Sequence, residues 1–232
     1  MTSSCSHDEA TRRYDGYMCG RYTLYTIDEL EDRYRVEVSG AIRPSYNVAP
    51  SQMMPVVTSN GMEIMRWGLI PKWAKDEKIG YKLINARSET SFEKPMWKGI
   101  IKRQRCLVPA NGFYEWQKRE SGKQPYYIHL PDEAIFSFAG VWEAWRHEGV
   151  DWHSYSILTT SPNHEMEPIH DRMPVILHEE DESQWLAADT EEDIRVLLAP
   201  YNDGALETYE VSTGVNTVKV NNETLIGPIN SK

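Results

Sequence analysis

Apolar and polar residues alternate along much of the chain, which is the period of half-buried β-strands. This alternation predicts strands over residues 21–25, 54–58 and 63–69, the last two joined as a hairpin at Asn60-Gly61. Further strands are predicted over 105–109, 126–130, 135–145, 154–160 and 208–212. Because short turns separate successive strands, we expect mainly antiparallel pairing.

Helical patterns are fewer and shorter. Thr26, with Glu29 three residues later, predicts a capping box and a helix that ends near Tyr34. Other helices are predicted over residues 91–103 (interrupted early by Pro95), 181–187 and 190–198. Together with the strands, they indicate an α+β fold in which short helices surround a mainly antiparallel sheet.

Composition narrows the class of protein. The 232 residues are 40% hydrophobic and 26% charged, which is typical of a globular protein. No apolar run approaches membrane-spanning length, so no membrane partner is expected. The three cysteines, Cys5, Cys19 and Cys106, show no pairing pattern, which favours a reducing, cytoplasmic location.

Domain organisation follows from the same pattern. No linker divides residues 18–228, so we expect a single domain there, monomeric by default. Residues 1–17 lack the apolar core of a secretory signal. We expect this leader to be disordered or to reflect a mis-assigned start.

Charge is unevenly distributed along the chain. The net charge is −10, yet residues 66–105 hold 11 Lys and Arg against 4 Asp and Glu. A basic stretch in an acidic protein would suit a phosphate-binding face. A solvated lysine-rich surface explains the count equally well.

Three reactive groups stand out from this pattern, namely Cys19, Glu115 and His170. Cys19 reads either as a small buried residue at the start of a strand or, if translation begins at Met18, as an N-terminal aminothiol. Alternation places Glu115 on the same face as Phe113, among aromatic residues. It is then either an ordinary exposed strand glutamate or an acid/base with a raised pKa.

His170, Asn85 and Arg87 each allow a structural and a functional interpretation. His170 either fixes a loop or takes part in chemistry, and Asn85 and Arg87, which share a strand face, either hold backbone carbonyls or bind a ligand. His164 and His170 lack the spacing of metal ligands on one helix, so no metal is expected. Cys106, in a short apolar strand, is expected to be plain core.

Six motifs, in order, resemble the SOS response-associated peptidase family, whose members process abasic sites. They lie at residues 18–23, 47–50, 66–71, 84–90, 112–116 and 169–174. The resemblance runs from Met18 to about Ile226 and implies a bifurcated, barrel-like sheet. It also implies a protein of the DNA damage response that needs no cofactor and binds single-stranded DNA containing abasic sites.

The resemblance assigns roles to individual residues. Cys19, once N-terminal, would form a reversible thiazolidine with the abasic aldehyde. Glu115 would shuttle protons and take part in self-cleavage ahead of the cysteine. His170 would assist Schiff-base formation and reversal, and Asn85 would position the sugar or the cysteine backbone.

The resemblance also implies a DNA-binding surface. Arginines are suited to phosphate because the guanidinium group binds it in bidentate fashion. The implied residues are Arg21, Arg87 and Arg172 for phosphates, Pro50 and Trp73 for bases, and Thr159 for the backbone. For Trp73, a place in the hydrophobic core is the competing interpretation.

The leader departs from the family, in which the cysteine is residue two. Either the start lies at Met18, or the leader is removed by self-processing, or the protein binds abasic DNA without stable linkage. Two other functions compete with cross-linking. One is a cysteine-type peptidase that uses Cys19, His170 and Glu115 on peptides, and the other is a non-enzymatic single-strand DNA-binding module.

Overall fold

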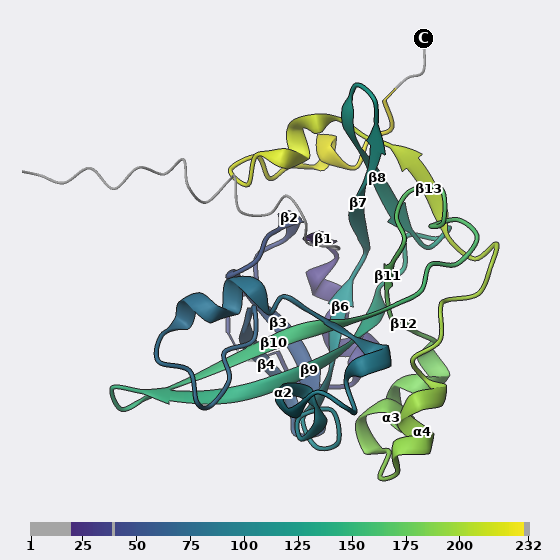
Figure 1. Ribbon diagram of the computed structural model, residues 1–232. Coiled ribbons are helices and arrows are strands. Elements are labelled where there is room, and N and C mark those ends of the chain that lie inside the picture. Colours follow the sequence, from purple (N-terminus) through teal and green to yellow (C-terminus); the bar gives the residue numbers. More distant parts are fainter. Residues whose placement is uncertain (1–19, 39, 230–232) are drawn as a thin grey trace, which may run out of the picture.

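A computed structural model of the protein describes residues 20–38 and 40–229 (Figure 1), so the predictions for the leader and Cys19 lie outside the described residues. The strands are β1 (Arg21–Leu24), β2 (Ser45–Val48), β3 (Met53–Thr58), β4 (Gly61–Trp67), β5 (Asn85–Arg87), β6 (Arg105–Ala110), β7 (Gly112–Arg119), β8 (Gly122–His129), β9 (Phe136–His147), β10 (Val150–Thr160), β11 (Met173–Pro174), β12 (Ile176–Leu177) and β13 (Glu207–Glu210). The α-helices are α1 (Leu30–Tyr34), α2 (Pro95–Lys98), α3 (Glu179–Ala187) and α4 (Glu191–Val196). Short 3₁₀ helices are η2 (Ile27–Glu29), η3 (Glu77–Lys82), η4 (Ser88–Thr90), η5 (Thr213–Asn216) and η6 (Glu223–Leu225).

The larger of the two sheets contains a closed barrel. Strands β10, β4, β3, β6 and β9 pair in that order, and the β9–β10 hairpin closes the ring. The β4–β10 pair is parallel and the others are antiparallel. The predicted α+β fold with a mainly antiparallel, barrel-like sheet is therefore confirmed.

A second sheet extends from the barrel and carries strands in the order β13-β8-β7-β1-β2. Strand β6 passes into β7 through the fully buried Asn111, so the two sheets share one nearly continuous stretch of chain. In Figure 1, β7 and β8 rise away from the barrel towards the C-terminal segment. The bifurcation at Asn111 is what separates the two sheets.

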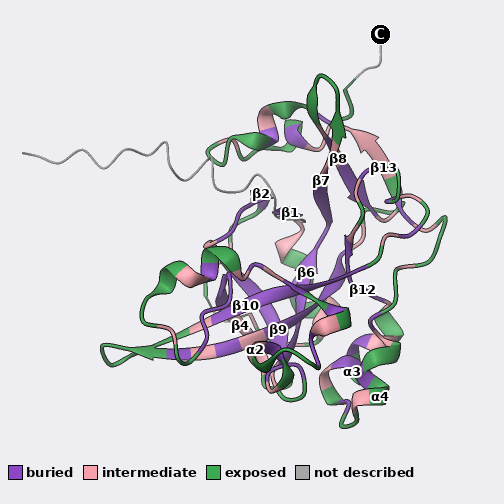
Figure 2. Ribbon diagram, viewed as in Figure 1, coloured by how far each residue is buried: buried purple, intermediate pink, exposed green. Residues whose placement is uncertain are grey.

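The two faces of β7 contact different cores. Phe113 packs into the large core inside the barrel, which also holds Tyr22 and Trp67. Tyr114 packs into a smaller cluster with Tyr127, while Trp116 lies at its edge. Figure 2 shows the strands of both sheets as largely buried. A residue of β7 that shares the face of Phe113 is thus directed towards the barrel side.

The start of α1 differs from the prediction. Thr26 makes no side-chain cap, and the segment opens as the 3₁₀ turn η2 before α1 begins at Leu30. The Thr26 hydroxyl instead accepts a hydrogen bond from Asn111 Nδ2 at 2.7 Å. A contact from Asn111, the residue between β6 and β7, has replaced the local cap.

Two other expectations are corrected. The helix predicted over residues 91–103 is wrong, because the α-helix is limited to α2, which begins at Pro95. Proline is tolerated at the first helical position, so Pro95 starts this helix rather than interrupting it. In the β3–β4 hairpin, Thr58 pairs with Gly61, so the turn lies at Ser59 and Asn60.

No helix in the described ranges is long and apolar enough to cross a membrane.

Candidate functional site

Glu115 is a buried carboxylate in β7. The residue is only 2% exposed, and its Oε1 accepts a hydrogen bond from the Trp116 backbone N–H at 3.2 Å. Arg21 pairs with Tyr114, so extending the antiparallel register by one step sets Gly20 level with Glu115. The burial of Glu115 shows that the interpretation as an ordinary exposed strand glutamate is wrong, and the acid/base role stays a prediction. The carboxylate lies where the chain enters β1.

Strand β5 lies on one edge of β10. The two strands are parallel, with Asn85 paired to Ile157 and Arg87 paired to Thr159. Ala86, between them, is buried, and its carbonyl accepts a hydrogen bond from the Thr159 hydroxyl at 3.4 Å. Asn85 and Arg87 therefore share a face, as predicted, and the pairing brings Arg87 beside Thr159.

Arg172 directly precedes β11, which pairs with β10 on the side opposite β5. Its Nη2 donates to the Thr159 carbonyl at 2.7 Å, and its two terminal nitrogens make a bidentate pair with the Glu89 carboxylate. Burial alone would raise the pKa of Glu89, but the hydrogen bonds from Arg172 and from the backbone, together with the charges of Arg172 and Arg87, outweigh it and hold that pKa below its usual value. The fork that was predicted to take a phosphate is occupied here by a carboxylate.

His170 lies in the turn before β11. Its backbone N–H donates to the Met166 carbonyl at 2.8 Å, and its ring Nδ1 accepts from the Arg172 backbone at 3.1 Å. The Asp171 carboxylate is 3.1 Å from the same nitrogen, a contact that requires a hydrogen on Nδ1 and therefore excludes the bond from the Arg172 backbone. In the neutral tautomer that accepts from the Arg172 backbone, the hydrogen is on Nε2, and the side chain is 28% exposed.

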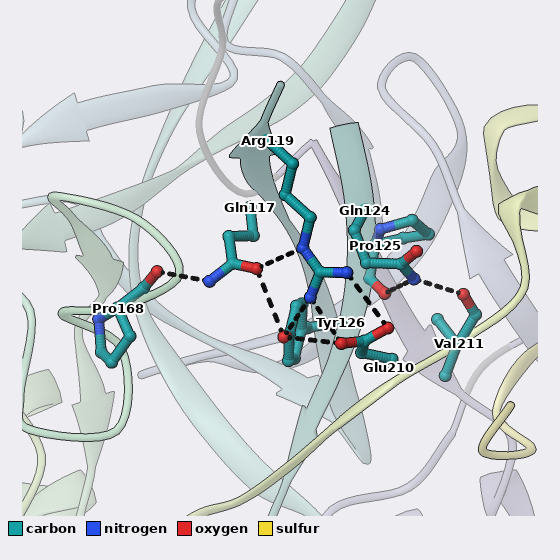
Figure 3. Close-up of polar contacts among 8 residues, drawn as sticks. All are labelled: Gln117, Arg119, Gln124, Pro125, Tyr126, Pro168, Glu210 and Val211. Carbon is teal, nitrogen blue, oxygen red and sulfur yellow. Dashed lines mark hydrogen bonds and ion pairs between the residues drawn. The ribbon is translucent and has the colours of Figure 1, made fainter. Parts of the chain in front are cut away.

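A direct contact joins the His170 turn to β7. The Gln117 amide donates from Nε2 to the Pro168 carbonyl at 2.8 Å (Figure 3). Gln117 lies two residues after Glu115 and so shares its strand face. Sequence reasoning missed Gln117, although the alternation that placed Glu115 also placed this amide on the same side.

The predicted base-contacting residues have different surroundings. Trp73 is 65% exposed, so a place in the core is wrong for it. Its loop is fixed by a hydrogen bond from the Trp145 indole to the Ala74 carbonyl at 2.9 Å. Pro50 is buried in the turn between β2 and β3, beside Ser51 with a φ of 73°. Trp73 thus offers an open ring, whereas Pro50 is held within a turn.

Arg21 and Cys106 complete the set of candidates. Arg21 is largely buried in β1, and its Nη1 donates to the Gly20 carbonyl at 2.8 Å. Cys106 is fully buried, as predicted for a core residue, and burial raises the pKa of its thiol. Raising the thiol pKa suppresses the reactive thiolate, so Cys106 is unsuited to nucleophilic chemistry. Within the described ranges, no group of three His, Cys, Asp or Glu could hold a metal ion.

Comparison with known proteins gives consistent matches. A family model described as SOS response associated peptidase (SRAP) matches residues 18–218. The chain is 45% identical over 221 residues to the abasic site processing protein YoaM of Bacillus subtilis, covering 90% of this chain and 97% of that protein. It is 33% identical over 230 residues to the abasic site processing protein HMCES of Gallus gallus, covering 82% of this chain and 68% of that protein. A crystal structure of a Bacteroides thetaiotaomicron protein superimposes with a TM-score of 0.84 at 29% identity, covering 91% of this chain and all of that one.

Proposed function

The chain belongs to the SOS response associated peptidase (SRAP) family, and from this premise we propose that it processes abasic sites in single-stranded DNA through a reversible covalent cross-link to Cys19. The proposal requires Cys19 to be the first residue of the mature chain. Two relatives that bear the name abasic site processing protein match nearly the full length of the chain.

The chemistry uses the two nucleophiles of an N-terminal cysteine. The α-amine, with an ordinary pKa of about 7.7–8.0, is partly neutral near pH 7 and adds to the C1′ aldehyde of the opened deoxyribose. Loss of one water gives an imine. The thiolate of Cys19 then adds to the imine carbon, and the nitrogen takes up a proton, which closes the thiazolidine. Addition of one water reverses the sequence.

The observation that carries the proposal is the burial of Glu115 level with Gly20, the residue that follows Cys19 in the sequence. A carboxyl group excluded from water can pass protons between the amine, the carbinolamine hydroxyl and the leaving water. The same group would activate water for hydrolysis of the Met18–Cys19 peptide bond if the leader is translated. In the proposal, one carboxyl group at this end of β1 serves each of these steps.

His170 and Asn85 take supporting roles in the proposal. The Nε2–H of His170 is suited to donate to the sugar oxygen, which assists imine formation and the ring opening that reverses it. Asn85, on β5, would position the sugar or the cysteine backbone.

The DNA path is proposed over the same face. Arg21, Arg87 and Arg172 would contact phosphates, Thr159 the backbone, and Pro50 and Trp73 the bases. The exposed ring of Trp73 supports stacking, which is tolerant of sequence and typical of single-strand binding. For Arg172, phosphate binding would compete with the Glu89 carboxylate.

A denaturing gel tests the proposal. Protein expressed from Met18 is incubated with single-stranded DNA that bears one abasic site, and a shifted band that survives denaturant is expected. Cys19→Ala should abolish the band and retain noncovalent binding, whereas Cys106→Ala, the control for a cysteine in the core, should retain both. Glu115→Gln should slow the reaction by about 10²–10⁴-fold.

The outcomes separate the competing functions. Absence of the band with the Met18 protein rules out the cross-link, and cleavage of peptides without DNA would favour a cysteine-type peptidase instead. Noncovalent binding alone would leave a DNA-binding module. Intact-mass measurement on protein from its native gene tests the premise, because retention of residues 1–18 would leave Cys19 without a free amine.

A further inference from the structure

The side chain of Gln117 bridges two segments that the proposed chemistry needs in fixed relation. One is β7, which carries Glu115, and the other is the turn that ends at His170. The bridge is a single hydrogen bond from Gln117 Nε2 to the Pro168 carbonyl at 2.8 Å. Figure 3 shows this amide directed at Pro168 on one side and at Arg119 on the other.

The orientation of the Gln117 amide is fixed by its other contacts. Its Oε1 accepts from Arg119 Nε at 2.7 Å and lies 3.4 Å from the Tyr126 hydroxyl. Because Arg119 has only donors, the amide oxygen must face it. The amide nitrogen is then directed at the carbonyl of Pro168.

Arg119 is itself held in place from β13. Its guanidinium makes a bidentate pair with Glu210, and its Nη2 also donates to the Tyr126 hydroxyl at 2.9 Å. The hydrogen bond from Arg119 lowers the pKa of Glu210, so this carboxylate remains ionised at neutral pH. The chain of contacts runs from β13 through β7 to Pro168.

The segment that receives the bond is short and stiff. Proline fixes its own backbone angle, and the N–H groups of Ile169 and His170 both donate to the Met166 carbonyl. Ile169 is buried in the barrel core. A bond to the Pro168 carbonyl therefore constrains the position of His170, two residues later.

We propose that Gln117 is a positioning residue that sets the place of His170 relative to Glu115 through the Pro168 carbonyl. The inference rests on the proposed cross-linking function of these two residues. Misplacement of a reacting group by about 1 Å costs on the order of 100-fold in rate, so one hydrogen bond at this junction has a measurable effect.

The matched test uses Gln117→Glu and Gln124→Glu. The first keeps an oxygen for Arg119 and replaces the donor to Pro168 with an acceptor. Gln124 pairs directly with Gln117 in the β7–β8 register, but its amide donates to the carbonyls of Pro125 and Val211. Gln124→Glu, the control, therefore adds the same negative charge and removes the same kind of amide donor, but it alters no hydrogen bond to the turn before β11 that contains His170.

Two readouts are measured on the chain that begins at Met18. In Gln117→Glu, the rate constant of cross-linking at saturating abasic single-stranded DNA should fall about 10- to 100-fold, while the half-saturating DNA concentration stays at the parental value. The ¹⁵N and ¹³C resonances of the His170 ring should shift. Gln124→Glu should leave both readouts unchanged.

Separate outcomes test this inference and the proposed function. A parental rate constant in Gln117→Glu overturns the inference, and so does an equal loss in Gln124→Glu. If the parent itself forms no cross-link, the proposed function fails, and the His170 resonances alone decide the inference. Unchanged resonances in Gln117→Glu would then overturn it.

Discussion

Glu115 and Gln117 are two residues apart on one strand, yet they do different things. Glu115 is buried at the barrel side of the second sheet, whereas Gln117 is half-buried and reaches across to Pro168. A strand places alternate residues on one face but does not fix their depth. Depth here depends on what packs over each residue, which makes one a candidate acid/base and the other a connector.

Trp73 provides a test at the residue scale. Because its ring is 65% exposed, Trp73→Ala should leave thermal unfolding unchanged. Loss of one stacked base should weaken binding to single-stranded DNA by about 1–3 kcal/mol, measured by fluorescence anisotropy. The control is Trp152→Ala, an exposed tryptophan on β10, which should bind like the parent. Equal affinity of Trp73→Ala and the parent would remove Trp73 from the DNA surface.

Glu89 should contribute a pH-dependent part of stability. Its pKa is lowered below 4.5 in the folded protein, so the native state binds fewer protons than the unfolded state. This contribution is fully present above about pH 4.5 and is lost as the pH falls through the folded pKa. Glu89→Gln should remove it, flattening the acid limb of urea midpoints measured between pH 3 and 7.

The control for Glu89 is Glu120→Gln, at the exposed tip of the β7–β8 hairpin. It should retain the parental acid limb. An unchanged acid limb in Glu89→Gln would mean that the pair with Arg172 contributes no pH-dependent stability. Glu89→Gln also removes the carboxylate that pairs with the Arg172 guanidinium. This variant should therefore bind DNA more tightly if Arg172 contacts phosphate.

At the scale of elements, strands were more predictable than helices. Alternation is a local signal, and it located β3, β4, β6, β9 and β10 to within a few residues. The start of α1 was not predictable, because the Thr26 hydroxyl bonds to Asn111, 85 residues away. Two contacts of the candidate site could not be predicted either, because their partners are far apart in the sequence. Arg172 and Glu89 are 83 residues apart, and Gln117 and Pro168 are 51 residues apart.

Asn111 tests how the two sheets are joined. Its Oδ1 accepts from the backbone of Tyr25 and Thr26, and its Nδ2 donates to the Thr26 hydroxyl. Asn111→Ala leaves these buried groups unpaired and should lower the free energy of unfolding by about 1–3 kcal/mol in urea titrations. Thr26→Ser, which keeps the hydroxyl, should match the parent. Parental stability of Asn111→Ala would show that water replaces these bonds.

At the scale of the whole molecule, opposite charges are segregated along the chain. Residues 66–105 are strongly basic, while the protein as a whole carries −10. This stretch includes η3, β5 and α2, which are linked to the barrel through β5 and β10. Arg66 and Arg105 of this stretch are buried but its lysines are exposed, so the lysines form a candidate cationic face on an acidic protein.

Salt should weaken DNA binding if this face contacts phosphate. The logarithm of the association constant should fall linearly with the logarithm of salt concentration, with a slope of about −0.7 per phosphate neutralised on single strands. Lys75→Ala, two residues from Trp73, should make the slope shallower. Lys219→Ala, an exposed lysine outside the basic stretch, should not. Binding that is insensitive to salt would exclude the basic stretch from the interface.

Strand β10 pairs with β9, β4, β5 and β11, so it joins segments that are distant in the sequence. On a ribosome, β4 and β5 emerge well before β10, whereas β9 emerges just before it and β11 after it. Neither the barrel nor the pairing of Arg87 with Thr159 is complete until β10 has been synthesised. The contacts that orient Gln117 through Arg119 also need Glu210. The arrangement on which the proposed cross-link depends can thus form only late in translation, after Glu210 has been added to the chain.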